Sequence, residues 1–155
     1  MVIFKCKMGE SQAGTCDDII YTTGLETCLC LIVLGHPATD GGSNKFMAHV
    51  SEGTLNDPDW RPQVTTFCNL VRAALADGLT IRHGLIITPT DTRGFYDDPD
   101  NEGEWEEKTE FVGGVRDFFE QELLDEHNLG ADVSWELLRD GGRGLKGKLI
   151  QRSLE

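Results

Sequence analysis

Short apolar runs separated by polar turns make up the first part of the chain. Val2–Met8 and Asp18–Thr23 carry β-branched and aromatic residues over strand-like lengths, and predict the first two strands. Thr27–Leu34 is the clearest strand, because it is short, apolar and partly β-branched. His36–Asn44 contains Pro, Asp and Gly-Gly and predicts a loop. Lys45–Ser51 is then expected to return beside Thr27–Leu34.

Helical spacing of apolar residues begins after this hairpin. Asp59–Asp77 predicts a helix, with Asp59 as its N-cap and Gly78 as its C-terminal stop. Thr80–Thr88 follows as a strand, and Thr109–His127 predicts a second helix. The apolar stripe of this second helix consists of Phe111, Val115, Phe118, Phe119 and Leu123.

The last part of the chain returns to the strand pattern. Val133, Trp135 and Leu137 alternate with polar neighbours, as in a half-buried strand. Gly141-Gly142 predicts a turn, and Leu145–Gln151 a closing strand. We therefore expect one α+β domain over residues 1–155, with two main helices packed on largely antiparallel sheets.

Composition narrows the classes of function. The 155 residues are 39% hydrophobic and 26% charged, as in a globular domain, and no apolar run approaches the roughly 20 residues of a membrane helix. The formal net charge of −13 repels phosphate backbones, so nucleic acid is not an expected partner. The charge would suit a basic protein partner or a salty environment, and it identifies neither. No secretory signal is visible, so the expected location is the cytoplasm, with unconventional export left open.

One polar stretch concentrates the negative charge. Residues 97–107 hold seven acids and no base: Asp97, Asp98, Asp100, Glu102, Glu104, Glu106 and Glu107. The spacing is only vaguely that of a calcium loop, because Thr109 stands where the bidentate glutamate should be. A solvated loop that could dock a basic partner is the preferred interpretation.

The cysteines offer a possible reagent. Their odd count of five argues against a disulfide framework, and the single close pair, Cys28 and Cys30, lacks a nearby set of zinc ligands. We expect no metal or organic cofactor, and reduced, independent thiols. A cysteine in an apolar strand is commonly core filling. Core or surface filling is the preferred interpretation of every thiol except Cys28.

Hairpin geometry gives Cys28 a partner. If the loop is centred between Ala38 and Thr39, His49 lies opposite Cys28, close enough for an imidazole to take the thiol proton. His36 is about 26 Å along the strand from Cys28 and is excluded. Thr22 is the nearest hydroxyl by position that could orient the imidazole. The sequence thus predicts a Cys28–His49 pair, provided that the register holds.

Two segments at these residues resemble the CheD family of chemoreceptor glutamine deamidases. Thr22-Thr23-Gly24-Leu25-Glu26-Thr27-Cys28 is similar to the motif that precedes the family's nucleophile, and Met47-Ala48-His49-Val50 to the segment with its histidine. Residues 111–116 and 140–144 resemble the start of the family's second helix and its late glycine turn. The order of the later elements also agrees.

The resemblance implies a catalytic set of Cys28, His49 and Thr22. It also implies the α/β/β deamidase sandwich that the family shares with toxins of the cytotoxic necrotizing factor type. The expected activity is hydrolysis of a side-chain carboxamide on a protein substrate, through a thioester. Glu26 and Thr27 are expected to contact the substrate, and backbone N–H groups near Glu26–Cys28 to hold the oxyanion.

Two alternatives stay open. Thr27–Leu34, His36 and Ala48-His49 also resemble protein N-terminal asparagine amidohydrolase, which leaves Gln or Asn as the substrate residue. Glu26 stands where the CheD family usually has glycine, and a carboxylate beside the thiol opposes thiolate formation. This departure favours a protein-binding module that has kept the fold and lost catalysis.

Overall fold

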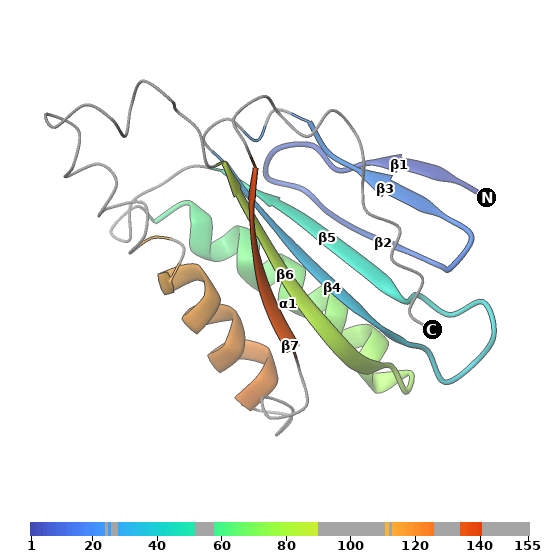
Figure 1. Cartoon of the computed structure of the whole chain (residues 1–155). Helices are drawn as coiled ribbons and strands as arrows, with labels where there is room; N and C mark the ends of the chain where they lie inside the picture. Colours follow the sequence, from blue (N-terminus) through green and yellow to red (C-terminus); the bar gives the residue numbers. More distant parts are fainter. Residues whose placement is uncertain are drawn as a thin grey trace, which may run out of the picture.

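The computed structural model describes residues 1–23, 25, 28–51, 58–89, 111, 113–125 and 134–140. The first part of the chain carries the strands β1 (Ile3–Lys5), β2 (Ser11–Gly14), β3 (Ile19–Tyr21), β4 (Leu29–His36) and β5 (Lys45–Val50). These are followed by α1 (Trp60–Ala76), β6 (Thr80–Pro89), the π-helical turn η2 (Glu120–Asp125) and β7 (Ser134–Asp140). Residues 113–119 are α-helical and continue into η2 (Figure 1).

The strands form a five-stranded sheet in the order β2-β5-β4-β6-β7 and a two-stranded sheet of β1 and β3. Pairing is antiparallel from β2 to β6, and parallel between β6 and β7 and between β1 and β3. The predicted α+β class with largely antiparallel pairing is therefore confirmed. The predicted turn at 141–142 and the closing strand Leu145–Gln151 lie outside the described residues.

Strand β2 is the main element that the sequence pattern did not predict. Its residues, Ser-Gln-Ala-Gly, lack the apolar alternation by which a half-buried strand is found. It forms because β5 offers a free edge, against which Ser11 pairs with Ala48 and Gly14 with Lys45. Tertiary pairing, rather than local preference, makes this segment a strand.

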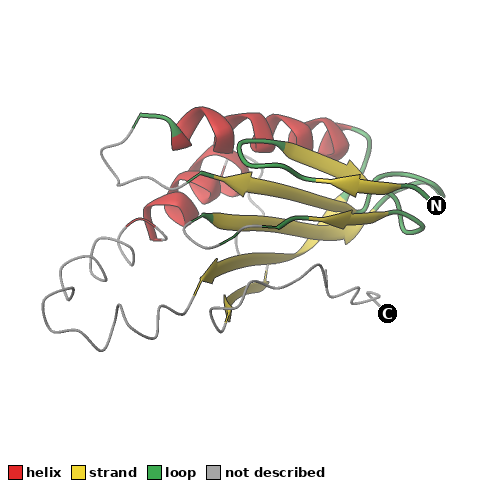
Figure 2. Ribbon diagram, turned by 90° about the horizontal axis from the view of Figure 1, so that it is seen from above, coloured by secondary structure: helices red, strands yellow, loops and turns green. Residues whose placement is uncertain are grey.

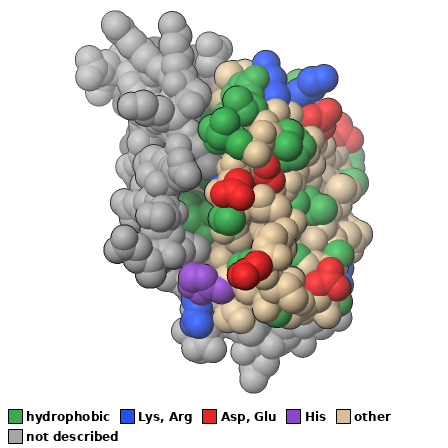
Figure 3. All heavy atoms as spheres, turned by 90° about the vertical axis from the view of Figure 1, so that its right-hand side faces the viewer, with side chains coloured by type: hydrophobic (Ala, Val, Ile, Leu, Met, Phe, Trp, Pro, Cys, Tyr) green, Lys and Arg blue, Asp and Glu red, His purple; other side chains and the backbone are tan. Residues whose placement is uncertain are grey.

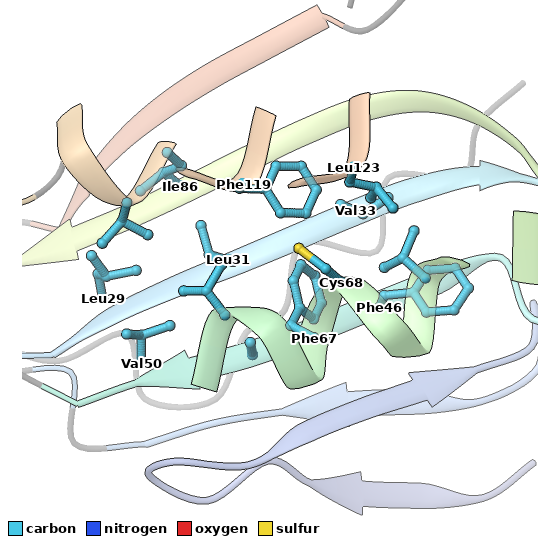
Figure 4. Close-up of a cluster of buried hydrophobic side chains, with 14 of the residues drawn as sticks. Leu29, Leu31, Val33, Phe46, Val50, Phe67, Cys68, Ile86, Phe119 and Leu123 are labelled. Atoms are coloured by element: carbon cyan, nitrogen blue, oxygen red, sulfur yellow. The ribbon is translucent and has the colours of Figure 1, made fainter. Parts of the chain in front are cut away.

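Both helices cover one face of the five-stranded sheet (Figure 2). The apolar side chains between them are called the helix-side cluster (Figure 4): Leu29, Leu31, Val33, Phe46, Ala48, Val50, Trp60, Val64, Phe67, Cys68, Val71, Leu79, Ile81, Ile86, Phe111, Val115, Phe119 and Leu123. The helices meet through aromatic rings, with the Phe67 and Phe119 centroids 5.7 Å apart. Within the described residues, no helix combines the length and apolarity needed to cross a membrane.

The opposite face of the sheet is covered by the N-terminal strands. Its buried side chains are called the thiol-side cluster: Cys6, Ile20, Leu25, Cys28, Cys30, Ile32 and Met47. Successive side chains of β4 alternate between the two clusters, Leu31 on the helix side and Cys30 on the thiol side, because strand residues point alternately to opposite faces. Both faces are buried, which explains why the predicted strand is almost continuously apolar.

Helix α1 largely follows the sequence prediction. It begins after Asp59, which occupies the N-cap position but makes no capping hydrogen bond with its side chain. Gly78 follows the helix with φ of +94°, as a glycine stop requires. A Cβ at Gly78 would lie 2.6 Å from that of Ala38, so this glycine also lets the β4–β5 loop pack on the helix end.

The register of the β4–β5 hairpin differs from the predicted one by two residues. His49 pairs with Cys30, and Val50 with Leu29, whereas the sequence prediction set His49 opposite Cys28. The turn lies later in the loop than assumed: Gly42 N–H donates to the Thr39 carbonyl at 3.1 Å, and Gly41 has φ of +83°. Strand β4 accordingly extends to His36.

Candidate active site

Cys28 lies directly before β4, at the edge of the thiol-side cluster, and its side chain is 4% exposed. The register places it diagonal to His49 rather than opposite, so the predicted direct pairing is wrong. A shift of two residues keeps a side chain on the same face of a sheet, so both residues still point to the thiol side. Diagonal neighbours are about 7–8 Å apart at their Cα atoms. Among the described residues, no hydrogen bond joins the Cys28 sulfur to His49 Nε2, so the pair shares a face without direct contact.

Thr22 and His49 are in direct contact, as the sequence predicted for an orienting hydroxyl. Thr22 Oγ1 lies 2.7 Å from His49 Nδ1 and 2.7 Å from the carbonyl oxygen of Cys6. Thr22 follows β3 and His49 belongs to β5, so the contact joins the two sheets. Both side chains are buried, at 9% and 3% exposed.

This arrangement fixes the tautomer of His49. A carbonyl oxygen accepts only, so the single hydroxyl proton of Thr22 is donated to Cys6 O. The Thr22 oxygen then accepts from His49, which must carry its proton on Nδ1. The Nε2 lone pair is therefore free, and no hydrogen-bond partner for this buried atom exists among the described residues.

Burial also controls the charge of His49. It lowers the pKa of the imidazole, because the charged form loses solvation, while the Cys6 carbonyl opposes this shift by favouring the protonated ring. His49 is thus a neutral base around pH 7, with a lone pair on the nitrogen that Thr22 leaves free. This is the state that a general base for a thiol requires.

The other buried thiols are poor nucleophiles. Burial raises the pKa of Cys30 far above its ordinary range, that of Cys6 to about 11 and that of Cys68 to about 12. All three stay protonated at neutral pH, and Cys30 is fully buried although it pairs with His49. Cys16 is exposed but lies outside the thiol-side cluster. Cys28 is therefore the best candidate for a reactive thiol near His49.

The structure does not place every predicted site residue. Glu26 and Thr27, expected to contact the substrate, lie outside the described residues, as does the acidic stretch 97–107. His36 is exposed at the far end of β4, and His83 pairs with Leu34 in β6. Neither imidazole is near Cys28.

The main-chain carbonyl of Cys6 is the group that sequence reasoning missed. Cys6 was expected to be core or surface filling, yet its oxygen accepts the Thr22 proton. Every residue carries such a carbonyl, so no side-chain pattern could have marked this position. Only the fold brings Cys6 to Thr22.

No metal site is evident in the part of the chain that the structure describes. Its residues hold no group of His, Cys, Asp and Glu side chains suited to a metal ion. A groove of about 450 Å³ lies between the β4–β5 loop and the end of α1, lined in part by Thr39, Ala74 and Asp77. It lies on the helix side, at the opposite end of the hairpin from Cys28, and so does not belong to this site.

The charge on the described surface does not identify a partner. On the face seen in Figure 3, acidic side chains are scattered among hydrophobic and neutral ones. Comparison with known proteins finds no matching family model and no matching curated sequence. The features that bear on function are therefore the sequence motifs and the geometry of Thr22, His49 and Cys28.

Proposed function

We propose that this protein is a cysteine-dependent protein deamidase of the CheD type, with Cys28 as nucleophile, His49 as general base and Thr22 as the residue that orients His49. The observation that carries the proposal is the bond between Thr22 Oγ1 and His49 Nδ1, at 2.7 Å. It leaves Nε2 unprotonated, with no partner among the described residues, on the sheet face that also holds Cys28. The layers of helices, five-stranded sheet and two-stranded sheet support the α/β/β architecture of that family.

The proposed reaction is hydrolysis of a side-chain carboxamide on a protein. His49 Nε2 takes the thiol proton, and the Cys28 sulfur attacks the carboxamide carbon to form a tetrahedral oxyanion. Backbone N–H groups near Glu26–Cys28 are proposed to hold this oxyanion, with Glu26 and Thr27 in contact with the substrate. The C–N bond then breaks, and His49 returns its proton to the departing ammonia.

The second half of the reaction releases the product. Water, deprotonated by His49, attacks the thioester carbon, and the C–S bond breaks to give a carboxylate and the Cys28 thiol. Nδ1 keeps its proton throughout, because Thr22 accepts from it. No cofactor takes part in these steps, and the substrate residue is proposed to be Gln, with Asn as the alternative.

Peptide mass spectrometry of candidate protein substrates tests the proposal. Wild-type protein should convert particular Gln or Asn side chains to carboxylates and release ammonia in equal amount. Cys28→Ser should abolish the conversion, whereas Cys30→Ser, a change at the neighbouring thiol on the same face, should retain most of it. Equal conversion by wild type and Cys28→Ser would reject the proposal. The modified position separates internal Gln from internal or N-terminal Asn.

Burial of the site favours one rival function. The side chains of Cys28 and His49 are 4% and 3% exposed, and a protein substrate must reach both. A binding module that has kept the fold and lost catalysis needs no such access. That rival predicts no conversion by wild type, together with wild-type binding of the partner protein by Cys28→Ser.

A further inference from the structure

The turn between β1 and β2 holds the backbone of His49 on both sides. Gly9 N–H donates to the His49 carbonyl at 2.7 Å, and His49 N–H donates to the Glu10 carbonyl at 3.1 Å. These two bonds extend the β2–β5 ladder by one step beyond the Ser11–Ala48 pair. Residues 6–10 thus fix the main-chain position from which the His49 side chain projects.

The same turn fixes the ring through Thr22. Cys6 N–H donates to the Tyr21 carbonyl at 2.8 Å, and the Cys6 carbonyl accepts from Thr22 Oγ1 at 2.7 Å. Cys6 is therefore bonded on both sides to the segment that carries Thr22. A displacement of Cys6 would move the acceptor on which the His49 tautomer depends.

The Cys6 thiol links the start of the turn to its end. It is fully buried and donates to the Glu10 carbonyl at 3.2 Å, the same oxygen that accepts from His49 N–H. Its contact with the Met47 carbonyl, at 3.7 Å, adds a link to β5. Burial raises the pKa of this thiol to about 11, so it remains a donor at neutral pH.

Local contacts give the turn a defined shape. Glu10 N–H donates to the Lys7 carbonyl at 2.9 Å, and Lys7 N–H donates to Glu10 Oε2 at 3.1 Å. Gly9 has φ of +82°, a conformation that glycine adopts without strain. The turn therefore has hydrogen bonds of its own in addition to those that it makes with His49.

We infer that Cys6 is a positioning residue for His49: its carbonyl, held in place by its buried thiol, keeps the imidazole protonated on Nδ1 and unprotonated on Nε2. The inference rests on the proposed function insofar as His49 is the general base. It assigns Cys6 no part in bond making or breaking. Cys6 acts on His49 only through two hydrogen bonds, one between His49 and Thr22 and one from Thr22 to the Cys6 carbonyl.

Nitrogen-15 NMR of the imidazole at a pH where His49 is neutral reports the tautomer directly and needs no substrate. Wild type should show the Nδ1–H form. Thr22→Val removes the hydroxyl that links His49 to the Cys6 carbonyl, so its ratio of Nε2–H to Nδ1–H is the reference for complete loss of this control. Cys6→Ala should increase the ratio of Nε2–H to Nδ1–H by about fivefold, the equivalent of one hydrogen bond. Cys6→Ser, which keeps a donor, should restore the wild-type ratio.

Two further variants separate positioning from general damage. Cys68→Ala removes an equally buried thiol from the helix-side cluster and should leave the tautomer ratio unchanged. Gly9→Ala adds a methyl group with no atom within 4 Å but strains the positive φ, and should shift the ratio in the same direction as Cys6→Ala. Gly9→Ala decides the question if Cys6→Ala does not fold.

A wild-type ratio in folded Cys6→Ala, or in Gly9→Ala where that variant decides, would overturn the inference. An equal shift in Cys68→Ala would do the same. The proposed function fails by a different result, namely absence of deamidation by the wild-type protein, whatever the tautomer. The two claims can therefore be rejected separately.

Discussion

The two faces of the five-stranded sheet bury side chains of different chemistry. On the helix side, β4 and β5 contribute Leu, Val, Phe and Ala to a cluster that is otherwise apolar and aromatic. On the thiol side, the same strands contribute Cys30 and His49, which lie with Cys6, Cys28 and Thr22 beneath the N-terminal strands. In each of these strands, alternate residues therefore stabilise the fold, and the thiol-side residues between them on β5 include the candidate general base, His49.

The comparison teaches that burial has opposite meanings on the two faces. A buried leucine on the helix side gains stability simply by leaving water. A buried imidazole on the thiol side loses solvation and is retained at some cost, with Nδ1 satisfied by Thr22 and Nε2 left without a partner in the described structure. An unsatisfied buried atom calls for a physical explanation, and the proposed role of His49 as general base supplies one for Nε2. Substitutions on the two faces should therefore separate stability from activity.

The largest expected effect is on the thiol side. His49→Gln should lower the deamidation rate by about 10²–10⁴-fold, because a positioned general base contributes that much. Circular dichroism should show a folded protein. The measurement is the rate of ammonia release on a substrate identified by mass spectrometry. His36→Gln, at an exposed histidine at the far end of β4, is the matched control and should retain activity. Loss of activity in both variants would argue against a special role for His49.

The second-largest expected effect is a loss of stability from a substitution on the helix side. Phe67→Ala should lower the free energy of unfolding by about 3–5 kcal/mol, because it leaves a cavity against Phe119. Urea unfolding measures this loss, and the rate of Cys28 alkylation in the remaining folded protein should change little. A loss below about 1 kcal/mol would show that the helix-side cluster is not the main source of stability.

The smallest effect is a pH dependence. Burial lowers the pKa of His49 in the folded state, whereas in the unfolded chain it returns to about 6.5. As the pH falls below about 6.5, the unfolded chain takes up a proton that the folded protein does not, so stability decreases down to the folded pKa. The slope from one group is at most about 1.4 kcal/mol per pH unit.

Urea unfolding at several pH values, with wild type and His49→Gln compared, isolates this contribution. The difference between the two proteins should shrink or reverse as the pH falls through this range. His36→Gln, which removes an exposed imidazole, should follow wild type. A pH-independent difference between wild type and His49→Gln would mean that burial does not oppose protonation of His49.

Much of the fold could be predicted because the strands and α1 carry clear periodic patterns. Strand β2 could not, since Ser11–Gly14 has no such pattern and takes its structure from β5. The register of the β4–β5 hairpin was wrong because it depends on where the loop turns, which Gly41 and the Thr39–Gly42 bond decide. Sequence gives the possible turn residues in this loop but does not rank them.

The candidate site was predicted in part for the same reason. The contact of Thr22 with His49 is present, while Cys28 lies diagonal to His49 instead of opposite. The prediction of a shared face survived because the register error was an even number of residues. The role of the Cys6 carbonyl could not be predicted, because the main chain leaves no mark in the sequence.

The most direct test of the account is the alkylation rate of each thiol in one sample, followed by peptide mass spectrometry after limited iodoacetamide treatment. Cys28 and Cys30 lie on the same face with exposures of 4% and 0%, so Cys30 is the internal reference. The account predicts that His49→Gln lowers the alkylation rate of Cys28 at neutral pH by at least about tenfold, while the slow rate of Cys30 stays unchanged. A Cys28 rate that is the same in wild type and His49→Gln would contradict the claim that His49 activates Cys28.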